Sequence, residues 1–177
     1  MNVKVGNTAP DVELDAYVRG AQGPQRLSLS DYRGGWLVLF FYPRDFTFVC
    51  PTELVAFEEL RGDFEEVGAS VVAASTDSYW SHQAWLSSSP VLDGVSYPVL
   101  ADPAHELAAA YGVLLEDGSA QRGTFVVDPE GVVRYASVTD LNVGRSAGEV
   151  LRVVYALQTG GLCPAGWRPG QPTLQAA

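Results

Sequence analysis

The sequence predicts an α/β protein in which helices cover both faces of a mixed central sheet. Apolar runs without alternation, at residues 35–43 and 69–76, are typical of strands that are buried on both faces. Segments with helical spacing follow these runs, so strands and helices alternate along the chain. A turn sequence at 128–131 joins two strands as an antiparallel pair, which makes the sheet mixed.

The chain begins with a predicted hairpin. Short alternating patterns at residues 11–14 and 26–29 surround the turn-rich segment GAQGP, and such a pair of strands is expected to flank the main sheet. We therefore expect an N-terminal hairpin extension beside the sheet.

A central strand and a long helix follow the hairpin. The run GWLVLFFYP over 35–43 predicts a strand that ends at Pro43. Apolar residues from 51 to 67 then recur at helical spacing, and Pro51 suits the first position of a helix. This places Cys50 at the amino end of a helix that directly follows a buried strand.

The second half of the chain alternates in the same way. Its predicted elements are a helix at 79–87 capped by Asp77 or Ser78, a strand at 97–102, a helix at 104–112 ending at Gly112, strands at 123–128 and 132–138, and a helix at 146–158. Pro and Gly are too frequent after it for regular structure. We therefore expect one domain over 1–160 and an exposed or partner-docked tail over 161–177.

Composition and charge exclude several classes of function. The 177 residues carry a formal net charge of -10, which argues against binding to nucleic acids and to anionic membranes. The segment MNVKVGNTAPDVEL lacks the pattern of a secretory signal, and no apolar run is long enough to span a membrane. A cytoplasmic location is therefore expected.

The two cysteines, Cys50 and Cys163, are the main candidates for chemistry. They form no CxxC pair and no zinc-binding spacing, and the single histidines His82 and His105 indicate hydrogen-bonded structural roles and no metal site. A cysteine in an apolar run is more often a small buried hydrophobe than a nucleophile. At a helix amino end, however, free backbone N–H groups and the helix dipole stabilise a thiolate.

The segment FFYPRDFTFVCPTEL contains a specific motif. Its residues Pro43, Thr47 and Cys50 match the PxxxTxxC pattern of peroxiredoxins. The similarity continues through STDSYWSHQAW (75–85), RGTFVVDPEG (122–131), DLNVGRS (140–146) and LCPAGWRPG (162–170), and so covers nearly the whole chain. The sequence resembles the typical two-cysteine subgroup of the alkyl hydroperoxide reductase C type, which implies a thioredoxin-like fold.

The resemblance implies a role for each residue around the nucleophile. Cys50 would attack the hydroperoxide, Thr47 would hydrogen-bond the peroxide and the thiolate, and Pro43 would shield the pocket from water. Arg122 would be the cation that stabilises the thiolate and polarises the peroxide. Arg145 and Glu53 would support Arg122.

Cys163 resembles the resolving cysteine of this subgroup. It would attack the Cys50 sulfenic acid of a neighbouring subunit, which implies a homodimer and, through ring formation, a decamer of dimers. A thioredoxin-like protein or a flavoprotein would supply the dithiol that reduces the disulfide. No organic cofactor and no metal is implied.

Two alternatives remain open at this point. A thioredoxin-fold disulfide reductase needs two cysteines around one turn, and the segment around Cys50 offers only one. A ring-forming holdase chaperone or a redox-sensing scaffold would use the same fold without turnover. Consumption of peroxide in the presence of a dithiol separates the classes, because a pure holdase shows none.

Overall fold

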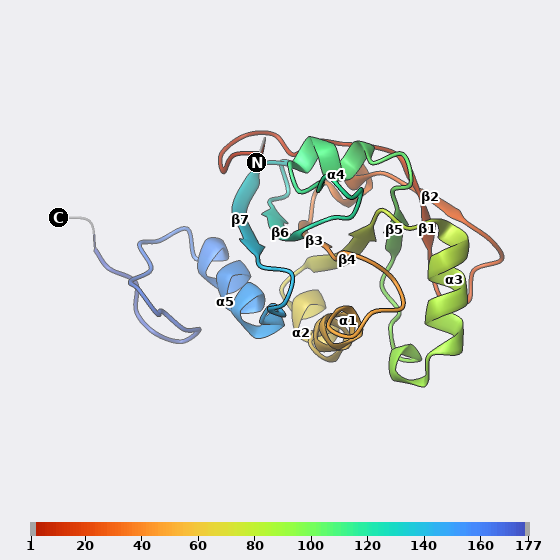
Figure 1. Ribbon diagram of the computed structural model, residues 1–177. Helices are drawn as coiled ribbons and strands as arrows, with labels where there is room; N and C mark the ends of the chain where they lie inside the picture. The colour runs from red at the N-terminus through yellow and green to blue at the C-terminus, as the bar shows by residue number, and fades with distance from the viewer. Residues whose placement is uncertain (1–2, 176–177) are drawn as a thin grey trace.

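The computed structural model describes residues 3–175 and arranges them in three layers around one seven-stranded sheet (Figure 1). The strands are β1 (Leu14–Tyr17), β2 (Gln25–Leu27), β3 (Trp36–Phe41), β4 (Ala69–Ser75), β5 (Val99–Ala101), β6 (Arg122–Val127) and β7 (Val133–Thr139). Their order is β2-β1-β5-β4-β3-β6-β7. Because β3 pairs in parallel with β4 and antiparallel with β6, the predicted mixed sheet is confirmed.

Helices cover both faces of this sheet. They are α1 (Cys50–Glu59), α2 (Arg61–Glu66), α3 (Tyr79–Ser88), α4 (Glu106–Tyr111) and α5 (Ala147–Gln158), with short 3-10 turns η1 (Leu29–Tyr32) and η2 (Pro90–Leu92). Figure 1 shows α4 on one side of the sheet, and α1, α2 and α5 on the other. None of the helices within residues 3–175 has the length and apolar character needed to cross a lipid bilayer.

Two hydrophobic cores, one on each face, explain the apolar run that predicts β3. Val38 and Phe40 pack into the core that contains residues of α1, α2, α3 and α5. Leu37, Leu39 and Phe41 pack into the core beneath α4. A strand that is buried on both faces needs apolar residues at every position, so the interpretation of 35–43 as a central strand is confirmed.

The single helix predicted over 51–67 is wrong, because the chain forms two helices there. Leu60 leaves the helical region with φ -100° and ψ 5°, between the end of α1 and the start of α2. Phe57 and Phe64 nevertheless stack with ring centroids 6.1 Å apart in the same core. Apolar periodicity reports which side chains are buried, and a change of backbone direction at one residue leaves that pattern intact.

The N-terminal hairpin forms, but its first strand starts three residues later than predicted. Leu14 pairs with Leu27, and β1 also pairs with β5, so the hairpin extends the sheet at one edge. Asp11 is not in the ladder. Its carboxylate accepts hydrogen bonds from the backbone N–H groups of Leu29 and Ser30 at 2.9 and 3.2 Å.

Two predicted capping residues, Ser78 and Gly112, are found at helix ends, and Ser146, predicted only as the start of a helix, caps a third. The Ser78 side chain accepts a hydrogen bond from the Ser81 backbone N–H at the start of α3. The Ser146 side chain does the same for Glu149 at the start of α5. Gly112 ends α4 with a left-handed φ of 67°, a conformation that favours glycine.

Candidate active site

The strand directions bring three distant segments to the same end of the sheet, where β3 ends and β6 begins. Cys50 begins α1, and the eight residues 42–49 separate it from Phe41 at the carboxyl end of β3. Because β6 runs antiparallel to β3, its first residue, Arg122, lies at this same end. Strand β7 returns to it, since Thr139 pairs with Arg122, and the following loop leads through Arg145 into α5.

Cys50 is placed for anion stabilisation at the amino end of α1. Val49 is the N-cap residue and makes no side-chain capping hydrogen bond, and Pro51 occupies the first turn. The Nη1 group of Arg122 donates a hydrogen bond to the Cys50 sulfur at 3.4 Å. The residue is completely buried. The sulfur therefore accepts a charge-assisted hydrogen bond in a water-poor environment.

Arg122 is held by three groups from two segments, the first turn of α1 and the loop after β7. Its Nε donates to the Leu141 carbonyl at 2.9 Å, and its Nη1 donates to Glu53 Oε2 at 2.5 Å as well as to the Cys50 sulfur. The next residue is Gly123, where a Cβ atom would lie only 2.7 Å from Val113 Cγ1. Glycine at this position lets the backbone of β6 pass close to the Val113 side chain, and this backbone carries Arg122.

Arg145 and Glu53 complete the cluster. Arg145 forms a two-pronged ion pair with Glu53, from Nε to Oε1 at 2.8 Å and from Nη2 to Oε2 at 2.9 Å. Its backbone N–H donates to the same carboxylate, and its Nη1 donates to the Gly123 carbonyl. The guanidinium also lies 5.0 Å above the Phe40 ring. These contacts leave Arg145 little rotational freedom.

The charges of this cluster balance only when the Cys50 sulfur is ionised. Glu53 forms the ion pairs to both Arg122 and Arg145, and all three side chains are at most 4% exposed. Two guanidinium groups and one carboxylate leave one excess positive charge. A thiolate at Cys50 cancels that charge, and buried charges that are unpaired are costly. The fixed charges around Cys50 are therefore complementary to a thiolate.

Pro43 and Thr47 lie in the loop that joins β3 to α1. Both are half-buried, whereas Phe46 and Phe48 in the same loop are exposed. The Thr47 hydroxyl donates its proton to the Arg44 carbonyl at 2.9 Å. The oxygen of Thr47 is thus oriented as an acceptor. The expected roles of Pro43 and Thr47 toward a peroxide stay predictions.

Cys163 lies outside the cluster, on the tail that follows α5. Both cysteines are free thiols. The half-buried sulfur of Cys163 lies 3.6 Å from the Ala156 carbonyl and 3.3 Å from Thr159 Oγ1, in the last turn of α5. It lines a groove of about 380 Å³ between α5 and the tail. Trp167 anchors the tail, because it is buried and its carbonyl accepts a hydrogen bond from Arg152.

Sequence reasoning brought together four of the residues that meet here, Cys50, Glu53, Arg122 and Arg145, but missed their backbone partners. The Leu141 carbonyl has no signal in the sequence, because any residue supplies a carbonyl.

A hydrogen-bonded structural role for His82 is confirmed by its contact with Asp45, 2.8 Å away. Within residues 3–175 no group of three or more His, Cys, Asp or Glu side chains is arranged to hold a metal ion.

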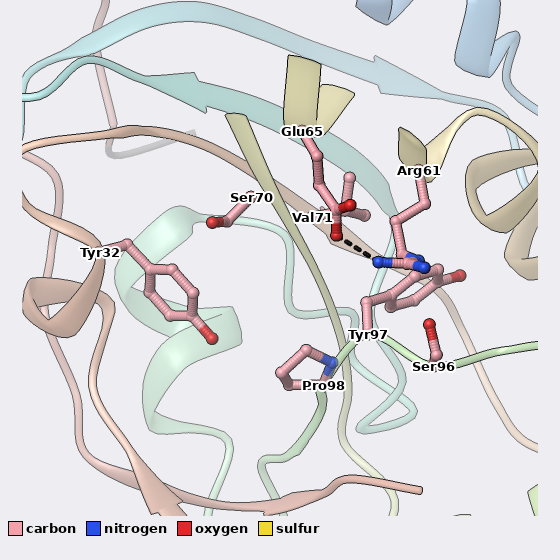
Figure 2. A pocket seen from close by; sticks show the side chains of 8 residues that line it. All are labelled: Tyr32, Arg61, Glu65, Ser70, Val71, Ser96, Tyr97 and Pro98. Carbon is pink, nitrogen blue, oxygen red and sulfur yellow. Dashed lines mark hydrogen bonds and ion pairs between the residues drawn. The ribbon is translucent and has the colours of Figure 1, made fainter. Parts of the chain in front are cut away.

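A second cavity, of about 230 Å³, lies at the other end of the central strands (Figure 2). Tyr32 and Tyr97 line it, and Arg61 forms an ion pair with Glu65 at its rim. It adjoins the amino end of β4, near Ser70, whereas Cys50 follows the carboxyl end of the parallel strand β3. This cavity is therefore separate from the Cys50 cluster.

Comparison with known proteins gives consistent matches. A family model described as the AhpC/TSA family matches residues 5–136, and one described as the C-terminal domain of 1-Cys peroxiredoxin matches residues 155–177. Peroxiredoxin tpx1 from Schizosaccharomyces pombe is 46% identical over 182 residues, covering 98% of this chain and 94% of the relative.

Solved structures agree with these matches. A reduced 2-Cys peroxiredoxin from Plasmodium vivax superposes with a TM-score of 0.90 at 32% identity, covering 97% of this chain and 92% of the other. AhpC from Enterococcus faecalis gives a TM-score of 0.86 at 38% identity, covering 93% and 100%. The thioredoxin-like fold that the resemblance implied is confirmed.

Proposed function

Because this chain belongs to the AhpC/TSA family of peroxiredoxins and is a thiol peroxidase, we propose that Cys50 attacks the hydroperoxide and that Cys163 of a second copy resolves the product. The observation that supports this assignment best is the hydrogen bond from Arg122 to the Cys50 sulfur. That bond lies in a buried cluster whose charges balance when the sulfur is a thiolate.

The first half-reaction follows from these positions. The Cys50 thiolate attacks one oxygen of the peroxide, so that an S–O bond forms as the O–O bond breaks. Cys50 is oxidised to the sulfenic acid, and the departing oxygen takes a proton and leaves as water or alcohol. Arg122 stabilises the developing negative charge, and the Thr47 oxygen accepts a hydrogen bond from the peroxide hydroxyl.

In the second half-reaction, the Cys163 thiolate attacks the sulfenic sulfur. A disulfide forms as the sulfenic S–O bond breaks, and the departing hydroxide takes a proton and leaves as water. Since Cys50 is completely buried, the loop before it and the first turn of α1 have to move before another thiol can reach its sulfur. An external dithiol then reduces the disulfide, and its own two sulfurs are oxidised in exchange.

We expect Cys163→Ser to separate the two half-reactions. Wild-type protein treated with one equivalent of peroxide should run as a covalent dimer on a non-reducing gel, and dithiothreitol should reverse the band. The variant should remain a monomer, yet its Cys50 sulfenic acid should still be trapped by dimedone and seen by mass spectrometry. A monomeric disulfide in oxidised wild-type protein, or a covalent dimer in the variant, would contradict the intersubunit assignment.

The edge strand β7 supports the proposed homodimer. It is seven residues long, lies at the end of the sheet and pairs with β6 alone among the named strands of residues 3–175. Residues 6 and 7 hydrogen-bond to β7 at Val133, and the backbone groups farther along a long edge strand can pair with the same strand of another copy. Val138 on β7 is 40% exposed, which adds apolar surface to this edge.

We expect Val138→Lys to weaken the dimer, because two copies of the new charge would approach each other at a symmetric interface. Sedimentation velocity should show a shift toward monomer, and oxidation should give less covalent dimer. Val91→Lys is the matched control, since Val91 is 65% exposed on η2, a turn that precedes β5, and three strands separate β5 from β7 in the sheet. An unchanged dimer in Val138→Lys would place the interface elsewhere.

The exposed aromatic side chains of Phe46 and Trp80, 61% and 67% accessible, offer a second interface through which dimers could join into a ring. A thioredoxin-like protein or a flavoprotein would reduce the disulfide. Two free thiols suit a reducing compartment such as the cytosol, and residues 161–177 would act as the resolving tail on a domain of residues 1–160.

A further inference from the structure

A buried hydrogen-bond network outside the Cys50 cluster ties the loop of residues 43–49 to the body of the protein. Asp45 is the only buried residue of this loop. Its Oδ1 accepts a hydrogen bond from the Tyr42 hydroxyl at 2.8 Å, and its Oδ2 lies 2.8 Å from His82 Nδ1. The Tyr42 and His82 side chains are fully buried. The loop is thus attached to β3 and to α3.

Two further contacts fix the His82 ring within this network. His82 Nε2 lies 3.2 Å from the Leu100 carbonyl, and the Tyr42 hydroxyl lies 3.3 Å from His82 Nδ1. Burial raises the pKa of Tyr42 well above its usual value, so its hydroxyl stays a donor to Asp45. Both carboxylate oxygens of Asp45 therefore have partners inside the protein.

The loop is also held in a conformation that it would not adopt alone. Phe46, next to Asp45, has a left-handed φ of 56°, which is unfavourable for a residue with a side chain. The Asp45 backbone N–H donates to Asp77 Oδ2 at 2.8 Å, so the backbone of Asp45 is held as well as its side chain. Local strain of this kind persists only where the surrounding contacts hold it. Release of Asp45 would therefore let the loop relax.

We propose that Asp45 is a positioning residue for the peroxidase reaction, whose contacts with Tyr42 and His82 hold the 43–49 loop in its closed form. The inference rests on the function proposed above. The closed loop keeps Thr47 and Cys50 in place for attack on the peroxide. Opening of the same loop exposes the Cys50 sulfur to Cys163. Asp45 therefore affects the two half-reactions in opposite directions.

This opposition distinguishes a positioning role from simple loss of stability. Asp45→Ala removes the contacts with Tyr42 and His82 and frees the loop. Oxidation of Cys50 by hydrogen peroxide should slow by about tenfold or more, because small displacements of reacting groups are costly. Disulfide formation from the sulfenic acid should become several-fold faster. Rapid-quench mixing followed by mass spectrometry measures the two rates separately.

A conservative substitution should restore both rates. In Asp45→Asn the amide oxygen can accept from Tyr42, and the amide NH₂ can donate to a ring nitrogen of His82 that carries no hydrogen. This variant should oxidise and resolve at wild-type rates. Tyr42→Phe removes one contact of the network and should change both rates in the same directions as Asp45→Ala, to a smaller extent. It keeps the test available if Asp45→Ala does not fold.

Arg19→Ala is the control for general destabilisation. Arg19 donates three hydrogen bonds to the carbonyls of Leu86, Leu92 and Val95, none of which belongs to the 43–49 loop. It should lower thermal stability and leave both rates unchanged. Unchanged rates in both Asp45→Ala and Tyr42→Phe, or parallel slowing of both steps, would overturn the positioning role. Failure of the wild-type protein to oxidise Cys50 would instead overturn the proposed function.

Discussion

Replacing Cys50 with serine is expected to reduce peroxide consumption to the rate without enzyme. A serine hydroxyl has no readily ionised form at neutral pH and cannot replace the thiolate as a nucleophile toward an O–O bond. Arg122, Glu53 and Arg145 would remain paired with one another. Disappearance of hydrogen peroxide in the presence of dithiothreitol is the measurement.

The controls for this variant test the fold and the class of activity. Serine is close to cysteine in size and can accept the hydrogen bond from Arg122, so the circular dichroism spectrum should remain that of the folded protein. Cys163→Ser should keep one turnover per Cys50. Turnover that persists in Cys50→Ser would place the nucleophile elsewhere, and a wild-type protein that consumes no peroxide would favour the holdase function.

Glu53→Gln is expected to have the largest effect on stability. Glu53 is 2% exposed and is the carboxylate that pairs with both Arg122 and Arg145. Its neutralisation leaves two buried guanidinium groups with at most the Cys50 thiolate as a countercharge, a loss of about 3–5 kcal/mol when one partner of a buried ion pair is removed. For a chain of this size, that corresponds to a fall in melting temperature of about 10 °C. Differential scanning calorimetry measures it.

The same variant should lose catalytic power for a geometric reason. Arg122 loses a charged partner at 2.5 Å that fixes its position beside Cys50, so kcat/KM for peroxide should fall by about 10²-fold. The variant places more positive charge around the sulfur, so alkylation of Cys50 by iodoacetamide should not slow. A parallel loss of alkylation and peroxide reduction would show that Glu53 acts on the thiolate and not on the position of Arg122.

An exposed ion pair supplies the matched control. Glu13 pairs with Arg26, and the two side chains are 61% and 56% exposed. Exposed pairs contribute little because water and salt screen them. Glu13→Gln should therefore leave both the melting temperature and the peroxidase rate unchanged. The contrast with Glu53→Gln would show that burial, and not the presence of an ion pair, gives Glu53 its importance.

Local patterns in the chain were sufficient for the central strands and several helix ends, but not for the bounds of β1. The apolar run at 35–43 became β3 because a strand covered on both faces leaves no position for a polar side chain. Gly112 and Ser146 mark helix ends through contacts within a few residues. The break at Leu60 was missed, since side-chain periodicity records burial and says nothing of one backbone angle.

The residues of the candidate site also differ in whether the sequence alone or only the tertiary structure identifies their contacts. Amino-acid types and their spacing were enough to single out Cys50, because a helix amino end and the PxxxTxxC pattern both lie within a few residues of it. Only the tertiary structure placed Arg122 against its sulfur, bound Glu53 to two arginines and buried Asp45 against His82. These partners are 37 to 92 residues apart. Strand order and direction, which no local pattern contains, decide which distant side chains share one end of the sheet.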